Sequence, residues 1–157
     1  MTIAVIDTNL LVALVDSRDK WHARARELAA ILEMHQVQVM YLDCVLNETI
    51  SVLARRAEEQ KRSEGFVDLL NRARHQIPET HIVWASLETR RLYAEIVELV
   101  QRTHGKLNFH DALIALLCRE WRISTLISFD TDFDQIPWLS RISEPDKIVD
   151  ILTLAHP

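Results

Sequence analysis

Hydrophobic residues follow two different patterns along this chain, short continuous runs and the spacing of amphipathic helices. Short apolar runs with the length of buried strands cover residues 3–6, 37–42, 81–85 and 124–129, with a shorter run at 141–142. Stretches with the spacing of helices lie between them, at residues 9–15, 21–34, 43–62, 63–77, 87–103 and 109–121, and a last one at 146–155. Strands separated by helices predict β-α-β units and a parallel sheet that is covered on both faces.

Residues suited to helix ends support these boundaries. Asp43, Ser86 and Asn108 each stand where a helix is expected to begin, and their side chains are good acceptors for free backbone N–H groups. Pro78 stops the helix predicted up to residue 77, and Gly105 is suited to the left-handed position after a helix. The sequence therefore predicts where several of the helices begin and end.

Length and composition predict one globular domain that spans residues 1–157. Hydrophobic residues make up 48% of the chain, which is enough for a sizeable core, and there are only 2 glycines and 4 prolines. Such a composition argues against collagen-like, disordered and turn-rich all-β proteins. The net charge of −5 excludes a broadly basic coat for nucleic acid but allows a local basic patch.

Two features predict a cytoplasmic protein. The only cysteines, Cys44 and Cys118, lie in apolar stretches and have neither disulfide-framework nor zinc-site spacing, which fits a reducing compartment. The N-terminus lacks the basic start and cleavage site of a signal peptide, and no apolar run is long enough for a membrane span.

Four carboxylates stand at informative positions. Asp7 closes the first predicted strand and Asp130 the fourth, so both face the carboxyl edge of the sheet, although either one alone is equally a turn residue. Glu48 lies on a largely apolar helical stripe, where an ionised carboxylate is costly without a cation or hydrogen-bond donor. Asp111 stands in the first turn of a helix that is apolar nearly all round.

Converging carboxylates without a matching lysine or arginine repel one another, and protons or metal ions must compensate their charge. A ligand set of oxygens only favours Mg²⁺ or Mn²⁺, which also contact phosphate oxygens. Such a centre suits phosphodiester hydrolysis better than acyl transfer. Gly-x-Ser-x-Gly, Walker and Gly-x-Gly-x-x-Gly motifs are absent from the sequence, which argues against the enzyme classes that these motifs mark.

The order of these motifs resembles that of the PIN-domain nucleases, and most closely the VapC-type toxins. The resemblance runs from residue 3 to about 142 and rests on Ile6-Asp7-Thr8-Asn9, Asn47-Glu48, Phe109-His110-Asp111-Ala112 and Ser128-Phe129-Asp130-Thr131-Asp132-Phe133-Asp134-Gln135-Ile136-Pro137. It implies a three-layer α/β/α sandwich and a Mg²⁺- or Mn²⁺-dependent ribonuclease. The acidic catalytic and metal-binding set of the family falls on Asp7, Glu48, Asp111 and Asp130.

The expected partners follow from this resemblance: an RNA substrate, an antitoxin protein and a second copy of the chain in a homodimer. RNA needs positive charge near the acidic residues, and Arg55, Arg56, Arg102 and Lys106 lie near the presumed rim. The charge run that holds the first two, residues 55–62, also reads as a solvated helix face. Which arginine contacts RNA stays open at this point.

Several roles have competing interpretations. Within the last motif, Asp130 is nearest the predicted site, Asp132 is either a second contact or a turn former, and Asp134 is expected to cap or solvate the loop. His110, at a helix start beside an apolar run, is read as structural rather than as a catalytic base.

Two other functions stay open. A phosphohydrolase of the haloacid dehalogenase type would place an aspartate after the first strand, but it needs Asp-x-Asp, and this chain has Asp7-Thr8-Asn9. The other alternative is a partner-binding module of the same fold without enzymatic activity.

Overall fold

The computed structural model describes residues 2–148, and its centre is a five-stranded parallel sheet with the strand order β3-β2-β1-β4-β5. The strands are β1 (Ile3–Ile6), β2 (Gln38–Leu42), β3 (Ile82–Val83), β4 (Thr125–Ile127) and β5 (Ser140–Ile142). Val5 of the central strand pairs with Met40 on one side and Leu126 on the other.

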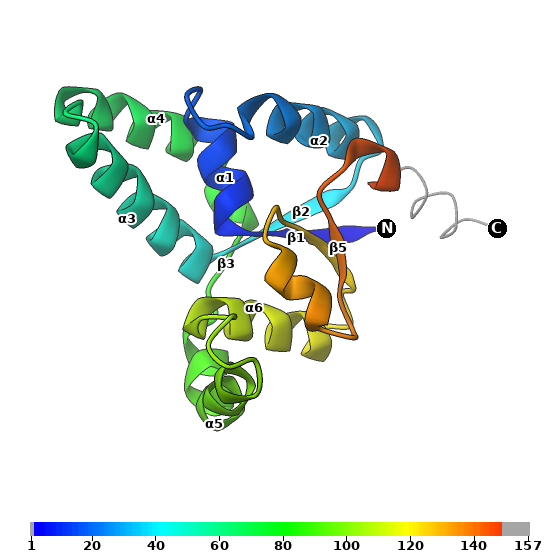
Figure 1. Ribbon diagram of the computed structural model, residues 1–157. Coiled ribbons are helices and arrows are strands. Elements are labelled where there is room, and N and C mark those ends of the chain that lie inside the picture. The colour runs from blue at the N-terminus through cyan, green and yellow to red at the C-terminus, as the bar shows by residue number, and fades with distance from the viewer. Residues whose placement is uncertain (1, 149–157) are drawn as a thin grey trace.

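Helices cover both faces of this sheet (Figure 1). They are α1 (Thr8–Val15), α2 (His22–Met34), α3 (Asp43–Glu59), α4 (Phe66–Gln76), α5 (Ser86–Arg102) and α6 (Phe109–Glu120). In Figure 1, α1 and α2 lie on one side of the sheet, α5 and α6 lie on the other, and α3 and α4 extend outward as a pair. The predicted α/β/α sandwich with a central parallel sheet is confirmed.

The core explains why the two most apolar helices lie against the sheet. In α6, every residue from Asp111 to Cys118 is buried, and α1 buries all but two of its residues. The side chains of α2 and α5 are buried along one stripe only, so these helices form the outer layer. Within residues 2–148, no helix combines the length and the hydrophobicity needed to span a bilayer.

Some helix ends differ from the sequence prediction. Asp43 is the first helical residue of α3 and not its cap, because Leu42 has the extended cap conformation and the Asp43 carboxylate accepts from the adjacent N–H of Cys44 (3.0 Å). Ser86 is likewise the first residue of α5, after Ala85. Asn108 caps α6 as predicted. Beyond α5, His104 (φ 53°) takes a left-handed conformation before Gly105 does.

The helices predicted over residues 43–62 and 63–77 are separated by a tight turn. The backbone of Lys61 is left-handed (φ 52°), and a 3-10 turn at Ser63–Gly65 follows before α4 begins. The strands predicted at 81–85 and 124–129 are shorter than expected. The last helix predicted, over 146–155, falls mostly outside the described residues.

The strand order places one crevice at a defined point. From β1 the chain moves to β2 and β3 on one side, and then crosses to β4 on the other side of β1. Ligands of open parallel sheets bind at such a reversal, beyond the carboxyl ends of the strands. Asp7 follows β1 at this point, and Ser128 follows β4.

Candidate active site

An open cavity of about 280 Å³ lies at this reversal, and it brings together all four carboxylates singled out from the sequence. They come from four separate segments: the end of β1, α3, the first turn of α6, and the loop after β4. The cavity is lined by Asp7, Thr8, Asn9, Val12, Glu48, Val52, Arg55, Arg56, Asn108, Asp111 and Asp130. A more apolar cavity of about 380 Å³ lies between α3 and α4 and contains none of the four.

Asp7 is the most buried acid of the cavity, with 4% of its surface exposed. One of its oxygens accepts from the backbone N–H of Thr8 (2.7 Å), which caps α1. The other accepts from the Asn9 amide and the Ser128 hydroxyl, both at 2.7 Å. Burial, together with the negative charges of Asp111 and Asp130, raises the pKa of Asp7 to about 7, although its hydrogen bonds with Ser128 and Thr8 oppose this shift. The side chain is thus rigidly held in a place that disfavours its charge.

Asp111 is fixed by the capping box of α6. Its carboxylate accepts from the backbone N–H of Asn108 (2.8 Å), while the Asn108 side chain accepts from the N–H groups of His110 and Asp111. Burial, together with the charges of Glu48 and Asp130, raises the pKa of Asp111 to about 6, although the hydrogen bond from Asn108 opposes this shift. The carboxylate therefore has a structural role as a cap and also faces the other acids.

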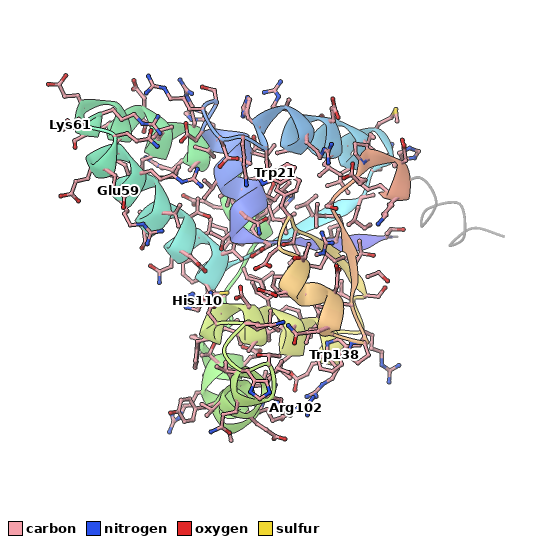
Figure 2. The ribbon with its side chains drawn as sticks, in the orientation of Figure 1. Trp21, Glu59, Lys61, Arg102, His110 and Trp138 are labelled. Atoms are coloured by element: carbon pink, nitrogen blue, oxygen red, sulfur yellow. The ribbon has the colours of Figure 1, made fainter. Side chains whose placement is uncertain are left out.

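Glu48 reaches the cavity from α3. One oxygen accepts from the Thr8 hydroxyl (3.3 Å) and lies 3.4 Å from Nδ1 of His110. Figure 2 shows His110 at the start of α6, next to the lower end of α3. The interaction with His110 lowers the pKa of Glu48 and raises that of His110. This pair therefore links the two helices across the rim of the cavity.

Asp130 is connected to Asp7 through one hydroxyl group. The Ser128 hydroxyl donates to Asp7, and it accepts from the backbone N–H of Asp130 (3.0 Å). The Asp130 carboxylate accepts from the N–H of Asp132 (2.8 Å). Asp132 does not line the cavity, and Asp134 pairs with Arg141 on the surface (2.7 Å). Of the three aspartates in this motif, only Asp130 faces the other acids.

Asn9 and Ser128 connect the two sides of the site, although neither belongs to the predicted acidic set; Ser128 is the serine of the family motif two positions before Asp130. The Asn9 amide donates to Asp7 and to Ser128 (3.2 Å), and its carbonyl accepts from the N–H of Phe129 (3.0 Å). This last bond takes Phe129 out of the strand ladder, which is one reason why β4 is shorter than predicted. The spacing of Asp7-Thr8-Asn9 and Ser128-Phe129-Asp130 contains both residues, but only the fold shows that they meet.

The donor set is chemically suited to a divalent cation. Glu48, Asp111 and Asp130 each keep one carboxylate oxygen without a hydrogen bond to any described residue. Across residues 2–148, no three histidine, cysteine or acidic side chains stand close enough to enclose a metal ion as they are now placed. The chemistry of the oxygens therefore fits a divalent cation, whereas their present spacing does not enclose one.

Comparisons with known proteins agree with this architecture. A family model described as PIN domain matches residues 4–139. The structure of VapC20 from Mycobacterium tuberculosis, a toxin that cleaves the sarcin-ricin loop, is similar with a TM-score of 0.63 and 23% sequence identity, covering 83% of this chain and 92% of that one. The structure of VapBC2 from Rickettsia felis, bound to a DNA fragment from their promoter, is similar with a TM-score of 0.65 and 18% identity, covering 90% of this chain and 98% of that one.

A comparison with curated proteins finds no match. At these identities the two structural similarities concern the fold alone. The family match is of a different kind, because it extends from the first strand to the loop after Asp130 and includes every acid of the cavity. The chain therefore belongs to the PIN domain family.

Proposed function

We propose that this protein is an endoribonuclease that depends on Mg²⁺ or Mn²⁺ and hydrolyses RNA, with Asp7, Glu48, Asp111 and Asp130 as its catalytic and metal-binding residues. One observation carries the proposal: four carboxylates from four segments line a single cavity, and the most buried of them, Asp7, has its pKa raised to about 7. Proteins rarely bury a carboxylate among like charges unless a ligand compensates for the cost.

The free oxygens of Glu48, Asp111 and Asp130, together with Asp7, would hold the ion. When bound, a divalent cation would supply Lewis-acid polarisation of a phosphate and a more acidic water. The protein's own contribution is positional. Ser128 and Asn9 fix the orientation of Asp7, the capping box fixes Asp111, and the packing of α1 and α6 buries both of these carboxylates.

RNA cleavage with and without chelator tests this function directly. We expect the purified protein to cleave single-stranded RNA in Mg²⁺ or Mn²⁺ and to lose this activity in EDTA. Water as the nucleophile needs no 2′-hydroxyl, so the products should carry 5′-phosphate and 3′-hydroxyl ends. These ends are identified by phosphatase treatment and ligation. Cyclic 2′,3′-phosphate ends together with full activity in EDTA would refute the proposed chemistry.

The His110→Ala variant tests whether a carboxylate or the histidine activates water. His110 contacts Glu48 but does not line the cavity, so we expect the cleavage rate to fall by no more than about tenfold. A general base normally contributes about a hundredfold or more. Single-turnover rates across the pH range would measure the difference, with Trp138→Phe, whose indole donates to the Ala115 carbonyl of α6 (2.8 Å), as a control for changes in this helix away from Glu48. A loss above a hundredfold would assign the base to His110.

The toxin role belongs to the same proposal. Of the two structural neighbours, VapC20 is a toxin, and VapBC2 was solved bound to a DNA fragment from their promoter. A toxin that cleaves the cell's own RNA has to be kept inactive by an inhibitor until it is needed. We therefore propose an antitoxin partner and a homodimer. Co-expression with the product of an adjacent small gene, followed by co-purification, tests the partner, and light scattering of the pure protein tests the dimer.

The haloacid dehalogenase alternative loses ground in the structure. The residue two positions after Asp7 is Asn9, and its amide and carbonyl are both used to connect β1 with the loop after β4. It is therefore a structural link and not a second catalytic acid. A partner-binding module without activity would not explain why the Asp7 carboxylate is buried among other acids, at a cost in folding free energy.

A further inference from the structure

The acidic cavity continues into a basic segment on the same face of α3. Glu48, Val52, Arg55 and Arg56 all line the cavity, and their spacing places them on one stripe of the helix. Arg55 follows Glu48 by seven positions, a distance of about 10 Å along the axis of an α-helix. The charge along this stripe therefore changes from negative at the carboxylates to positive two turns further on.

The two arginines differ in what they already bind. Arg55 is exposed and makes no ion pair or hydrogen bond with any described residue. Arg56 is partly buried, and its Nη1 donates to Asp19 (2.6 Å), whose other oxygen accepts from the N–H of Trp21 (2.8 Å). The remaining nitrogens of Arg56 have no partner among residues 2–148. The charge run at residues 55–62, which the sequence also allows as a solvated helix face, thus presents free guanidinium donors to the cavity.

Positive charge at this place meets a physical need of the proposed reaction. RNA is a polyanion, whereas the chain carries a net charge of −5 and concentrates four carboxylates in the cavity. An ion at the carboxylates would compensate for one phosphate only, and the neighbouring phosphates of the strand would still be repelled. Guanidinium groups bind phosphate through paired hydrogen bonds, which makes arginine the suitable residue here.

We infer that Arg55 and Arg56 bind a backbone phosphate of the substrate that neighbours the phosphate to be cleaved, and so set how a single strand enters the cavity. This inference rests on the proposed ribonuclease function and adds to it two positioning residues and a path along α3. Because the contacts are to phosphate, they orient the strand without reading its sequence.

Binding is measured separately from cleavage, in an Asp7→Asn background that does not cut. The probe is a short, fluorescein-labelled, single-stranded RNA of mixed sequence, and anisotropy gives its dissociation constant at several salt concentrations. We expect Arg55→Gln and Arg56→Gln each to weaken binding by about tenfold. Each change should also make the slope of log K against log salt shallower by about 0.7, the amount for one phosphate contact.

Three controls separate phosphate binding from structural effects. Asp19→Asn breaks the same ion pair as Arg56→Gln but removes a negative charge, so this variant should bind RNA at least as tightly as its parent. Arg122→Gln removes an exposed positive charge beyond the other end of α6 and should leave the affinity and the slope unchanged. Arg55→Lys keeps the charge and should restore the slope.

The outcomes distinguish this inference from the function on which it rests. Unchanged affinity and slope in both arginine variants would overturn the inference, as would a loss of affinity in Asp19→Asn equal to that in Arg56→Gln. If the wild-type protein failed to cleave RNA while the arginine variants still lost binding as expected, the hydrolytic function would fail and the phosphate site would stand.

Discussion

Replacing Asp7 with asparagine is expected to abolish RNA cleavage and, in the absence of divalent ions, to raise the stability of the protein at alkaline pH. Loss of a group that supports a metal ligand typically lowers metal affinity or activity by about tenfold to a hundredfold. Loss of a ligand itself should therefore lower the cleavage rate by more than about a hundredfold. The stability gain has a separate cause, because the variant removes a negative charge from a buried place among other acids.

The effect of Asp7→Asn on the free energy of unfolding is expected to depend on pH. Burial, with the charges of Asp111 and Asp130, raises the pKa of Asp7 from 3.8 to about 7 in the folded protein. The folded state therefore keeps a proton that the unfolded state releases, and the contribution of Asp7 to the free energy of unfolding falls as the pH rises from about 4 to 7. Asparagine does not titrate, so the variant should lack this decline. Each pH unit within that window is worth about 1.4 kcal/mol, so we expect the stability of the variant relative to wild type to rise by roughly 2–3 kcal/mol between pH 5 and pH 8.

Urea unfolding at pH 5 and pH 8 in EDTA measures this difference. Glu59→Gln, at the exposed end of α3 (Figure 2), removes a charge without touching the cavity and should change neither activity nor the pH dependence of stability. Mn²⁺ should stabilise the wild type through binding to the folded state, and should do so much less in Asp7→Asn. A variant that cleaves RNA at the wild-type rate, or that gains equal stability at both pH values, would contradict the assignment of Asp7.

Replacing Asp16 with alanine is expected to cost about 3 kcal/mol of folding free energy, because it leaves a partly buried arginine without its partner. Asp16 ends α1 and is 2% exposed, and its two oxygens accept from Nη1 and Nη2 of Arg62 at 3.3 and 2.8 Å. Nε of Arg62 is buried and has no hydrogen-bond partner among residues 2–148. This pair attaches the turn between α3 and α4 to the body of the protein.

Activity should fall with this loss of stability, since α3 carries Glu48, Arg55 and Arg56. Burial is the largest influence on Asp16 and opposes its ionisation, but the hydrogen bonds from Arg62 and the Arg18 backbone N–H, together with the charges of Arg62 and Arg56, outweigh it and lower the pKa. Its stabilising contribution is therefore present at neutral pH and is lost as the solution is acidified through that lowered pKa. The alanine variant should lose this part of the acid dependence.

A double-mutant cycle of Asp16→Ala with Arg62→Met isolates the coupling between the two side chains. Glu98→Ala is the matched control, because it breaks the ion pair with Arg102 in α5, whose two side chains are 66% and 63% exposed. Pairs of that kind contribute less than about 1 kcal/mol. Equal effects of Asp16→Ala and Glu98→Ala would show that the Asp16–Arg62 pair does not anchor the turn.

The sequence by itself sufficed to predict the positions of the strands and of most helices. It also singled out the four acids by their places at strand ends and on apolar helices. Periodicity sufficed for α6 because its apolar side chains point in all directions, and such a helix has to be buried. Asn108 marked its first turn correctly. The same logic failed at Lys61, where a charged, helix-compatible segment turns sharply. The turn is stabilised by contacts from outside it, including the ion pair between Arg62 and Asp16.

Only the tertiary structure decided which polar groups meet. Asp7 and Ser128 are 121 residues apart in sequence, yet their side chains are hydrogen-bonded, because β1 and β4 are neighbours in the sheet. The raised pKa of Asp7 and the free donors of Arg55 likewise depend on what lies around each side chain. Hydrophobic patterns are local properties of the chain. The energy of a charge depends on its whole surroundings, and these exist only once the chain has folded.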